Sequence, residues 1–186
     1  MPDRIRGIIP VMLTPFLDSG AIDYAGVERL IEWYLANGSD ALFAVCQSSE
    51  MQFLSLSERE ALGRFVVSTV AGRVSVVVSG HISETLDEQI AELRAAARTG
   101  ADAVVFVTNR LDPRQEGTVA FRRTLDALIR ALPADLSLGL YECPAPYRRL
   151  LSDDELSICI ETGRFVLLKD VSCVRHDRSP GEAAPG

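Results

Sequence analysis

Lysine is nearly absent from this chain. Lys169 is the only lysine among 186 residues, and every other strongly basic side chain is an arginine. Arginine can form the surface ion pairs that lysine forms, but only the amine can lose its proton and attack a carbonyl carbon to form a Schiff base. Lys169 follows the apolar run 165–168, which predicts a strand buried on both faces. Because α/β barrels carry their reactive groups at the carboxyl ends of strands, Lys169 is a candidate nucleophile.

Other absences narrow the class of protein. No apolar run approaches the roughly 18 residues of a membrane span, and residues 1–6 lack the basic and then apolar pattern of a signal peptide. We therefore expect a cytoplasmic protein with no membrane partner. The net charge is −7 and no basic cluster is present, which argues against a nucleic-acid partner.

The sequence also lacks the usual patterns of metal and cofactor sites. Its four cysteines show neither close pairing nor neighbouring histidines, and its two histidines are isolated, so neither a disulfide framework nor a zinc site is expected. No GxGxxG or Walker-type glycine loop follows the first apolar run, which leads instead into Thr14-Pro15-Phe16. We expect no cofactor and no metal.

Six apolar runs recur along the chain at intervals of about 30 residues, the length of a βα unit. Continuous rather than alternating apolar runs predict parallel strands that are covered on both faces. The runs begin near Ile5, Ala41, Val74, Ala103, Leu136 and Phe165. Six such units permit an open doubly wound sheet or part of an eightfold barrel.

The stretches between these runs have the apolar period of helices. One stripe contains Val27, Leu30, Ile31, Tyr34 and Leu35, and another contains Phe121, Leu125, Leu128, Ile129 and Leu132. A serine or threonine three residues before a glutamate is typical of a helix N-terminus. This pattern predicts three helix starts, at Ser57 with Glu60, Thr85 with Glu88, and Ser152 with Glu155. We expect these stripes to face the core.

The last residues of the chain differ in character from the rest. Residues 174–186 are polar, rich in proline and glycine, and without periodicity, which predicts a disordered tail. An eightfold barrel needs about 250 residues. The expected architecture is therefore a partial (β/α)8 TIM barrel at residues 1–173, with about six units present and the last two missing, as in a truncated barrel.

An ordered set of motifs between about residues 7 and 173 resembles the dihydrodipicolinate synthase and N-acetylneuraminate lyase family. The matching residues include Gly7, Thr14-Pro15-Phe16, Gly38-Ser39-Asp40, Ala71-Gly72-Arg73, Gln115-Glu116-Gly117, Tyr141 with Pro144, and Lys169-Asp170. The resemblance implies a (β/α)8 barrel whose lysine, on the sixth strand, forms a Schiff base with pyruvate or a related 2-oxo acid. It also implies a homo-oligomer, and it assigns the nucleophile to Lys169.

The resemblance further implies roles for residues around the lysine. Tyr141 would shuttle protons; otherwise it is a core aromatic at the barrel rim. Gln47, Ser48 and Ser49 would hold the oxo-acid carboxylate; otherwise they form an ordinary polar turn. Arg110 stands where the sequence departs from the family; its guanidinium is a candidate to bind an acidic or hydroxylated substrate, and the alternative is a solvated loop arginine.

Several positions depart from the pattern of the synthases. Gln47 replaces a threonine of the family's proton relay, and residues 108–111 lack the tyrosine that completes it. Residues 142–146 replace an Asn-x-Pro-Gly-Arg pattern, with Arg148 and Arg149 displaced downstream. These departures favour a divergent lyase, aldolase or dehydratase that acts on a sugar-derived 2-oxo acid. The alternatives are a truncated relative without activity, and a module that binds an oxo acid without turnover.

Overall fold

A computed structural model of the protein describes residues 5–171. The predicted tail at 174–186 and residues Cys173 and His176 lie outside the described residues, so the division into a barrel domain and a tail stays a prediction.

Five parallel strands form one sheet in the order β1-β2-β3-β4-β5. The strands are β1 Ala41–Ala44, β2 Ser75–Ser79, β3 Ala103–Val107, β4 Ser137–Tyr141 and β5 Phe165–Lys169. Each strand pairs with the next one along the chain, whereas a doubly wound sheet reverses its strand order at a switch point. The prediction of a partial TIM barrel is confirmed.

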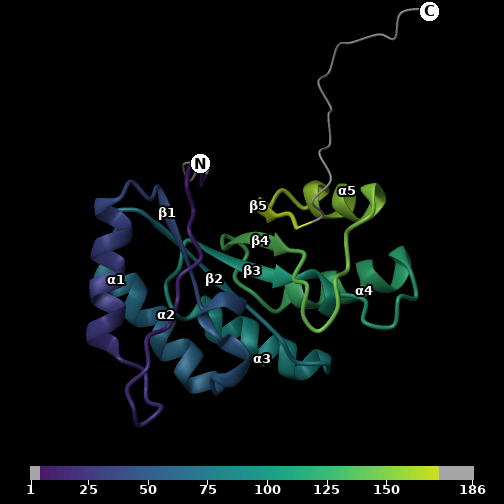
Figure 1. The fold of residues 1–186 in the computed structure, drawn as a ribbon. Helices are drawn as coiled ribbons and strands as arrows, with labels where there is room; N and C mark the ends of the chain where they lie inside the picture. The colour runs from purple at the N-terminus through teal and green to yellow at the C-terminus, as the bar shows by residue number, and fades with distance from the viewer. Residues whose placement is uncertain (1–4, 172–186) are drawn as a thin grey trace, which may run out of the picture.

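The sheet curves strongly enough to bring its first and last strands together. In a flat sheet, β1 and β5 would lie about 19 Å apart, because neighbouring strands are about 4.8 Å apart. The Lys169 Nζ atom of β5 nevertheless lies 5.4 Å from the ring centre of Phe43 in β1. This contact brings the carboxyl ends of the two strands to the same side of the sheet, which curves like part of a barrel wall (Figure 1).

The predicted first strand is not a regular strand. The segment after Ile5 runs beside β1 and makes one parallel bridge, between Val11 and Phe43. The Met12 N–H donates to the Phe43 carbonyl at 2.9 Å, and the Phe43 N–H donates to the Pro10 carbonyl at 3.0 Å. Pro10 has no N–H to extend this ladder. The segment still occupies the first place in the barrel wall, so the described sheet has five strands rather than six.

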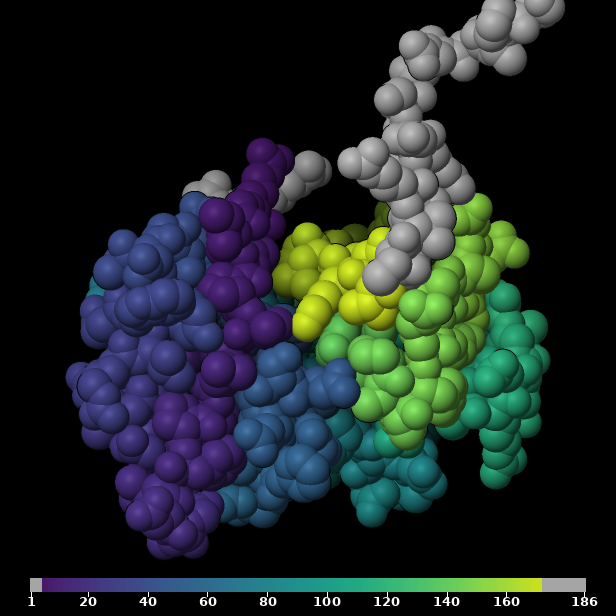
Figure 2. Space-filling model, viewed as in Figure 1, coloured from purple at the N-terminus to yellow at the C-terminus, as the bar shows by residue number. Residues whose placement is uncertain are grey.

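Five helices form an arc around the outside of the sheet, from α1 to α5 (Figure 1). They are α1 Tyr24–Ala36, α2 Leu56–Val70, α3 Leu86–Ala97, α4 Thr118–Arg130 and α5 Asp153–Glu161, with short 3-10 turns η1 Gln47–Ser49, η2 Met51–Phe53 and η3 Thr108–Arg110. The predicted stripes face the core, since Val27, Ile31, Phe121, Leu125 and Leu128 are fully buried. Figure 2 shows the N-terminal segment (purple) and the residues around β5 (yellow) on one face of the molecule.

The start of α2 corrects one predicted cap. Ser55 is the N-cap: its hydroxyl accepts from the Glu58 N–H at 3.3 Å, and its own N–H donates to the Glu58 carboxylate at 2.8 Å. Serines at 55 and 57 precede glutamates at 58 and 60 with the same spacing, so the pattern alone could not separate them. The predicted caps at Thr85 and Ser152 are confirmed.

This correction predicts different effects for two neighbouring serines. Ser55→Ala should lower the free energy of unfolding by about 1 kcal/mol, because the Glu58 N–H loses its acceptor. Ser57→Ala, inside the first turn, should change it by less than about 0.5 kcal/mol. Urea unfolding followed by circular dichroism measures both variants. A larger loss at Ser57 would contradict the assigned cap.

Candidate active site

Lys169 ends β5 with its amine over an aromatic face. It pairs in register with Tyr141, the last residue of β4. The Nζ atom lies 4.3 Å from the Tyr141 ring centre and 5.4 Å from that of Phe43. Aromatic faces attract a cation and exclude water on their side. The amine is thus held between β1 and β4 on the inner side of the curve.

The strand that carries Lys169 is less buried than the sequence predicts. No residue of β5 is fully buried, and Leu168 is 40% exposed. The physical reason is that β5 is the last strand of the described sheet, so one of its sides has no neighbouring strand. The strand predicted at residues 165–168 to be buried on both faces is therefore only partly buried, and the rings of Tyr141 and Phe43 are the apolar groups nearest to the amine.

Tyr141 is 3% exposed, and its hydroxyl is held by Gln47. The phenol donates to the Gln47 side-chain oxygen at 3.0 Å, and the Cys143 thiol donates to the same oxygen at 3.3 Å. Burial, and then the neighbouring thiols of Cys143 and Cys46, raise the pKa of Tyr141 above its usual value. The phenol consequently keeps its proton at neutral pH and is available as a hydrogen-bond donor.

The turn after β1 holds the three residues predicted to bind a carboxylate. Gln47 is half-buried beside Tyr141, and Ser48 is exposed, with no hydrogen bond from its hydroxyl to the described residues. Ser49 is 1% exposed; its hydroxyl donates to the Met12 carbonyl at 2.7 Å and accepts from the Cys46 N–H at 3.1 Å. The Ser49 hydroxyl is thus already used to fasten the N-terminal segment to the turn.

The backbone of this turn is unusual. Val45 has a φ of 50° and Glu50 a φ of 59°. A positive φ is rare for a β-branched residue and costs on the order of 1–3 kcal/mol, and such strain collects at functional sites. The strained positions flank residues 46–49 and fix the direction in which the turn leaves β1.

The different environments of Ser48 and Ser49 give a matched pair of variants. Ser49→Ala should lower the free energy of unfolding by about 2 kcal/mol, because the buried Met12 carbonyl and Cys46 N–H lose their partner. Ser48→Ala, at an exposed hydroxyl, should change it by less than about 0.5 kcal/mol. Guanidinium unfolding measures both. Equal stability of the two variants would contradict the structural role of the Ser49 hydroxyl.

Arg110 and Gln47 line one cleft at the carboxyl ends of the strands. Its volume is about 290 Å³, and its lining also includes Ile82, Val107 and Cys143. The Arg110 side chain is 15% exposed and lies 3.6 Å from the exposed Glu84 carboxylate. That contact is long for a hydrogen-bonded pair, so the guanidinium keeps donors for a ligand.

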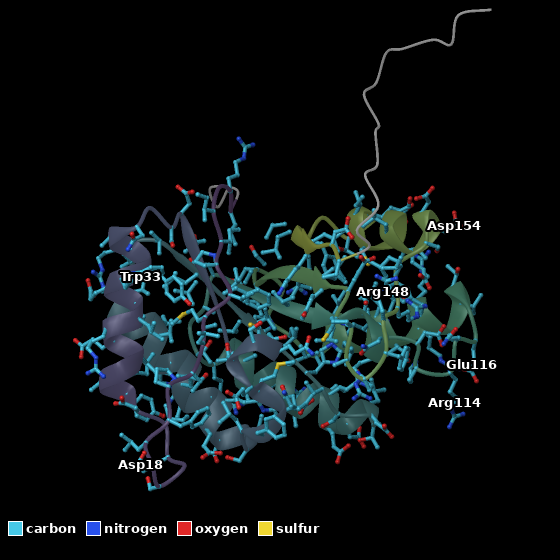
Figure 3. The ribbon with its side chains drawn as sticks, in the orientation of Figure 1. Asp18, Trp33, Arg114, Glu116, Arg148 and Asp154 are labelled. Atoms are coloured by element: carbon cyan, nitrogen blue, oxygen red, sulfur yellow. The ribbon has the colours of Figure 1, made fainter. Side chains whose placement is uncertain are left out.

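The two downstream arginines are placed differently. Arg149 pairs with Asp112 at 3.3 Å and Glu155 at 2.6 Å, so its guanidinium ties the β4–α5 loop to neighbouring elements. Arg148 is exposed and donates to the Val171 carbonyl at 3.4 Å. Figure 3 places it in the part of the molecule that holds α4 and α5, remote from α1. Neither arginine lines the 290 Å³ cleft.

Phe43 and Cys143 are site neighbours that the sequence interpretation missed. Cys143 is two residues beyond Tyr141, so the alternation of side chains along a strand could have placed it on the same face. Phe43 stands in a four-residue strand that is buried throughout, and a continuous apolar run does not reveal which side chains face inward.

The described residues do not form a metal site. Within 5–171, no group of three or more histidine, cysteine or acidic side chains could hold a metal ion. His81 is fully buried, and burial lowers its pKa to about 4, so it is a neutral core residue whose Nε2 accepts from the Val107 N–H. No helix within the same range is long and apolar enough to span a membrane.

Comparisons with known proteins agree with this geometry. The model of the dihydrodipicolinate synthetase family matches residues 4–145. A 4-hydroxy-tetrahydrodipicolinate synthase from Cereibacter sphaeroides is 39% identical over 169 residues, which cover 90% of this chain and 56% of that protein. One from Ruegeria pomeroyi is 38% identical over 170 residues, with the same two coverages.

Solved structures lead to the same family. A dihydrodipicolinate synthase from Bacillus anthracis aligns with a TM-score of 0.77 and 32% identity, over 91% of this chain and 56% of that one. A synthase from Acinetobacter baumannii, solved with pyruvate, aligns with a TM-score of 0.77 and 28% identity, over 90% and 56%. The chain thus spans little more than half the length of these relatives. On its sequence and its fold, the chain belongs to the dihydrodipicolinate synthase family.

Proposed function

We propose that the protein is a Schiff-base-forming lyase or aldolase that acts on pyruvate or a related 2-oxo acid. The observation that carries the proposal is the position of the only lysine, whose Nζ lies 4.3 Å from the ring centre of Tyr141 at the carboxyl end of the sheet.

The proposed chemistry begins with the unprotonated amine of Lys169, which attacks the C2 carbonyl carbon of the oxo acid. The carbinolamine that forms must gain a proton on its oxygen to leave as water, and an iminium ion remains. Tyr141, which keeps its phenolic proton, would donate that proton after its hydroxyl rotates away from Gln47. The iminium then acts as an electron sink for cleavage or formation of the adjacent C–C bond.

The oxo-acid carboxylate requires hydrogen-bond donors near the amine. We assign this role to the free hydroxyl of Ser48 and to the side-chain amide of Gln47. Ser49, whose hydroxyl is already bonded on both sides, would position the turn rather than touch the substrate. Arg110 would bind an acidic or hydroxylated group at the far end of the substrate, across the cleft that it shares with Gln47.

The residues that differ from those of the synthases bear on the class of reaction and substrate. The amide oxygen of Gln47 accepts a hydrogen bond from the Tyr141 phenol, but an amide cannot take up that proton and donate another one as a hydroxyl group does. The hydroxyl relay that the family's threonine forms therefore has no equivalent at position 47. Arg149 is occupied by Asp112 and Glu155 and cannot replace a substrate-binding arginine. We therefore favour a divergent lyase, aldolase or dehydratase that acts on a sugar-derived 2-oxo acid over the reaction of the synthases named among the relatives.

The exposed edge of β5 is relevant to the oligomeric state of the protein. Among residues 5–171, β5 is an edge strand with an exposed Leu168, and such an edge can pair with another chain, so we propose that the protein works as a homo-oligomer. The cytoplasmic location expected from the sequence stays a prediction.

Borohydride trapping separates this function from its alternatives. The protein is incubated with pyruvate or another 2-oxo acid and treated with borohydride, and its mass is then measured by intact mass spectrometry. A Schiff-base enzyme gains the mass of the oxo acid less one oxygen atom, because imine formation releases water and hydride then converts the iminium to a stable secondary amine. Ligand binding without added mass would indicate an oxo-acid-binding module. Neither binding nor added mass would indicate an inactive relative, and either result would overturn the proposal.

A further inference from the structure

The two segments that depart from the pattern of the synthases are joined to each other in the fold. Residues 108–111 follow β3 and residues 142–146 follow β4, and these strands are neighbours in the sheet. Both segments line the 290 Å³ cleft, the first through Arg110 and the second through Cys143. The contact between the segments therefore shapes the part of the cleft that we assign to the far end of a substrate.

The loop after β4 has few hydrogen-bond donors of its own. Pro144 and Pro146 have no backbone N–H, so a regular ladder of N–H bonds cannot hold this stretch. Pro144, Ala145 and Pro146 are also exposed, so burial contributes little to fixing them. A fixed loop of this composition depends on donors from elsewhere that reach its carbonyl oxygens.

Asn109 supplies such a donor group. The residue is fully buried, and its Nδ2 donates to the Cys143 carbonyl at 2.9 Å, the Ala145 carbonyl at 2.9 Å and the Tyr147 carbonyl at 2.8 Å. An amide nitrogen carries two hydrogens, so one hydrogen is shared between two of the three oxygens. One side chain at the end of β3 thus holds three carbonyls of the loop after β4.

The three carbonyls also determine which way the Asn109 amide points. An oxygen in place of Nδ2 would meet three acceptors with no hydrogen between them, so the nitrogen must occupy this position. The Oδ1 atom is then left buried, and it has no donor among residues 5–171. A buried acceptor without a donor costs free energy. The unpaired oxygen indicates that the side chain is placed to satisfy the three carbonyls rather than its own two polar atoms.

We propose that Asn109 is a specificity-determining positioning residue: it fixes the loop at residues 143–147 against the segment that carries Arg110, and so sets the shape of the cleft for the part of a 2-oxo acid beyond its C2 carbonyl. Asn109 is not among the residues that line the cleft, so it acts through those that it holds. The role in specificity rests on the proposed function, whereas the contact with the loop does not.

Side-chain amide NMR tests the contact in the wild-type protein. The sequence contains two asparagines, and the other one, Asn37, is exposed, with its Nδ2 donating to the Trp33 carbonyl at 2.7 Å. In protein labelled with 15N-asparagine, we expect the Asn109 amide to exchange its hydrogens with solvent at least about tenfold more slowly than the Asn37 amide. The variant Asn37→Asp removes one signal and so assigns the other. Equal exchange of the two amides would overturn the proposal.

A matched pair of variants tests the role in specificity. Asn109→Asp keeps the shape of the side chain but sets a carboxylate oxygen against the three carbonyls, whereas Asn37→Asp makes the same change on the surface. The rate of borohydride-trapped adduct formation is measured separately with pyruvate, 2-oxobutyrate and 2-oxoglutarate. We expect the ratio between the fastest and the slowest acid to fall about tenfold in Asn109→Asp, because a loose cleft wall discriminates less between substrates. The ratio should stay unchanged in Asn37→Asp.

The ratio of rates separates specificity from stability. Partial unfolding lowers the rates with all three acids by the same factor and leaves their ratio unchanged. If Asn109→Asp does not fold, Asn109→Ala removes the donor without adding a charge and should lower the ratio in the same direction. An adduct with an unchanged ratio in the folded variant would overturn the role of Asn109 alone. Absence of any adduct on the wild-type protein would overturn the proposed function, so the two failures are distinguishable.

Discussion

Lys169→Arg should abolish the borohydride-trapped adduct with pyruvate. The variant keeps the positive charge over Tyr141 and Phe43, but a guanidinium does not deprotonate at accessible pH and cannot form an imine. The expected result is complete loss of the added mass with little change in the unfolding midpoint. Intact mass spectrometry and urea unfolding measure the two quantities.

The arginine-rich composition allows a matched control for this experiment. Arg148→Lys in the Lys169→Arg background restores one lysine on an exposed loop, away from both aromatic rings. We expect this double variant to be labelled no faster than free lysine in solution. Fast labelling of the double variant, or persistence of the adduct in Lys169→Arg, would show that the reactivity does not depend on the site.

Tyr141→Phe should slow adduct formation by a factor of about 10² to 10⁴, the usual contribution of a positioned proton donor. The phenylalanine ring keeps the aromatic face under the Lys169 amine, and Cys143 can still donate to Gln47, so the fold should change little. The measurement is the rate of adduct formation at a fixed borohydride concentration, with pyruvate in excess.

Tyr147→Phe is the matched control for loss of a phenol. Its hydroxyl donates to the carbonyls of Asn109 and Pro113, in loops outside the contacts between Tyr141 and Lys169. We expect its adduct to form at nearly the wild-type rate. Equal slowing by the two variants would assign the effect to general loosening of the loops and would remove Tyr141 as the proton donor.

Much of the fold could be predicted because its signals are local. Continuous apolar runs located all five strands, and the helical stripes located the buried faces of α1 and α4. The burial of β5 could not be predicted from its own residues. Its apolar run predicts a buried strand, but that burial requires a neighbouring strand on each side, and the described sheet has none beyond β5. The segment at residues 8–13 is similarly apolar, yet Pro10 limits its ladder.

The roles of some site residues could be predicted from the sequence, and those of others could not. The lysine stood out by composition, and its contact with Tyr141 follows from equivalent positions at the ends of adjacent strands. The hydroxyls of Ser48 and Ser49 look alike in the sequence, but only the fold shows that Ser49 is used by Met12 and Cys46. Phe43 touches Lys169 only because the sheet curves, and no local pattern encodes that contact.

Fragmentation mass spectrometry of the reduced pyruvate adduct tests the central claim most directly. Lys169 is the only lysine in the sequence, so an adduct on a lysine side chain has a single possible position. We predict that the added mass lies on the peptide that contains Lys169. An adduct confined to any other peptide, or no adduct on a folded protein, would contradict the account.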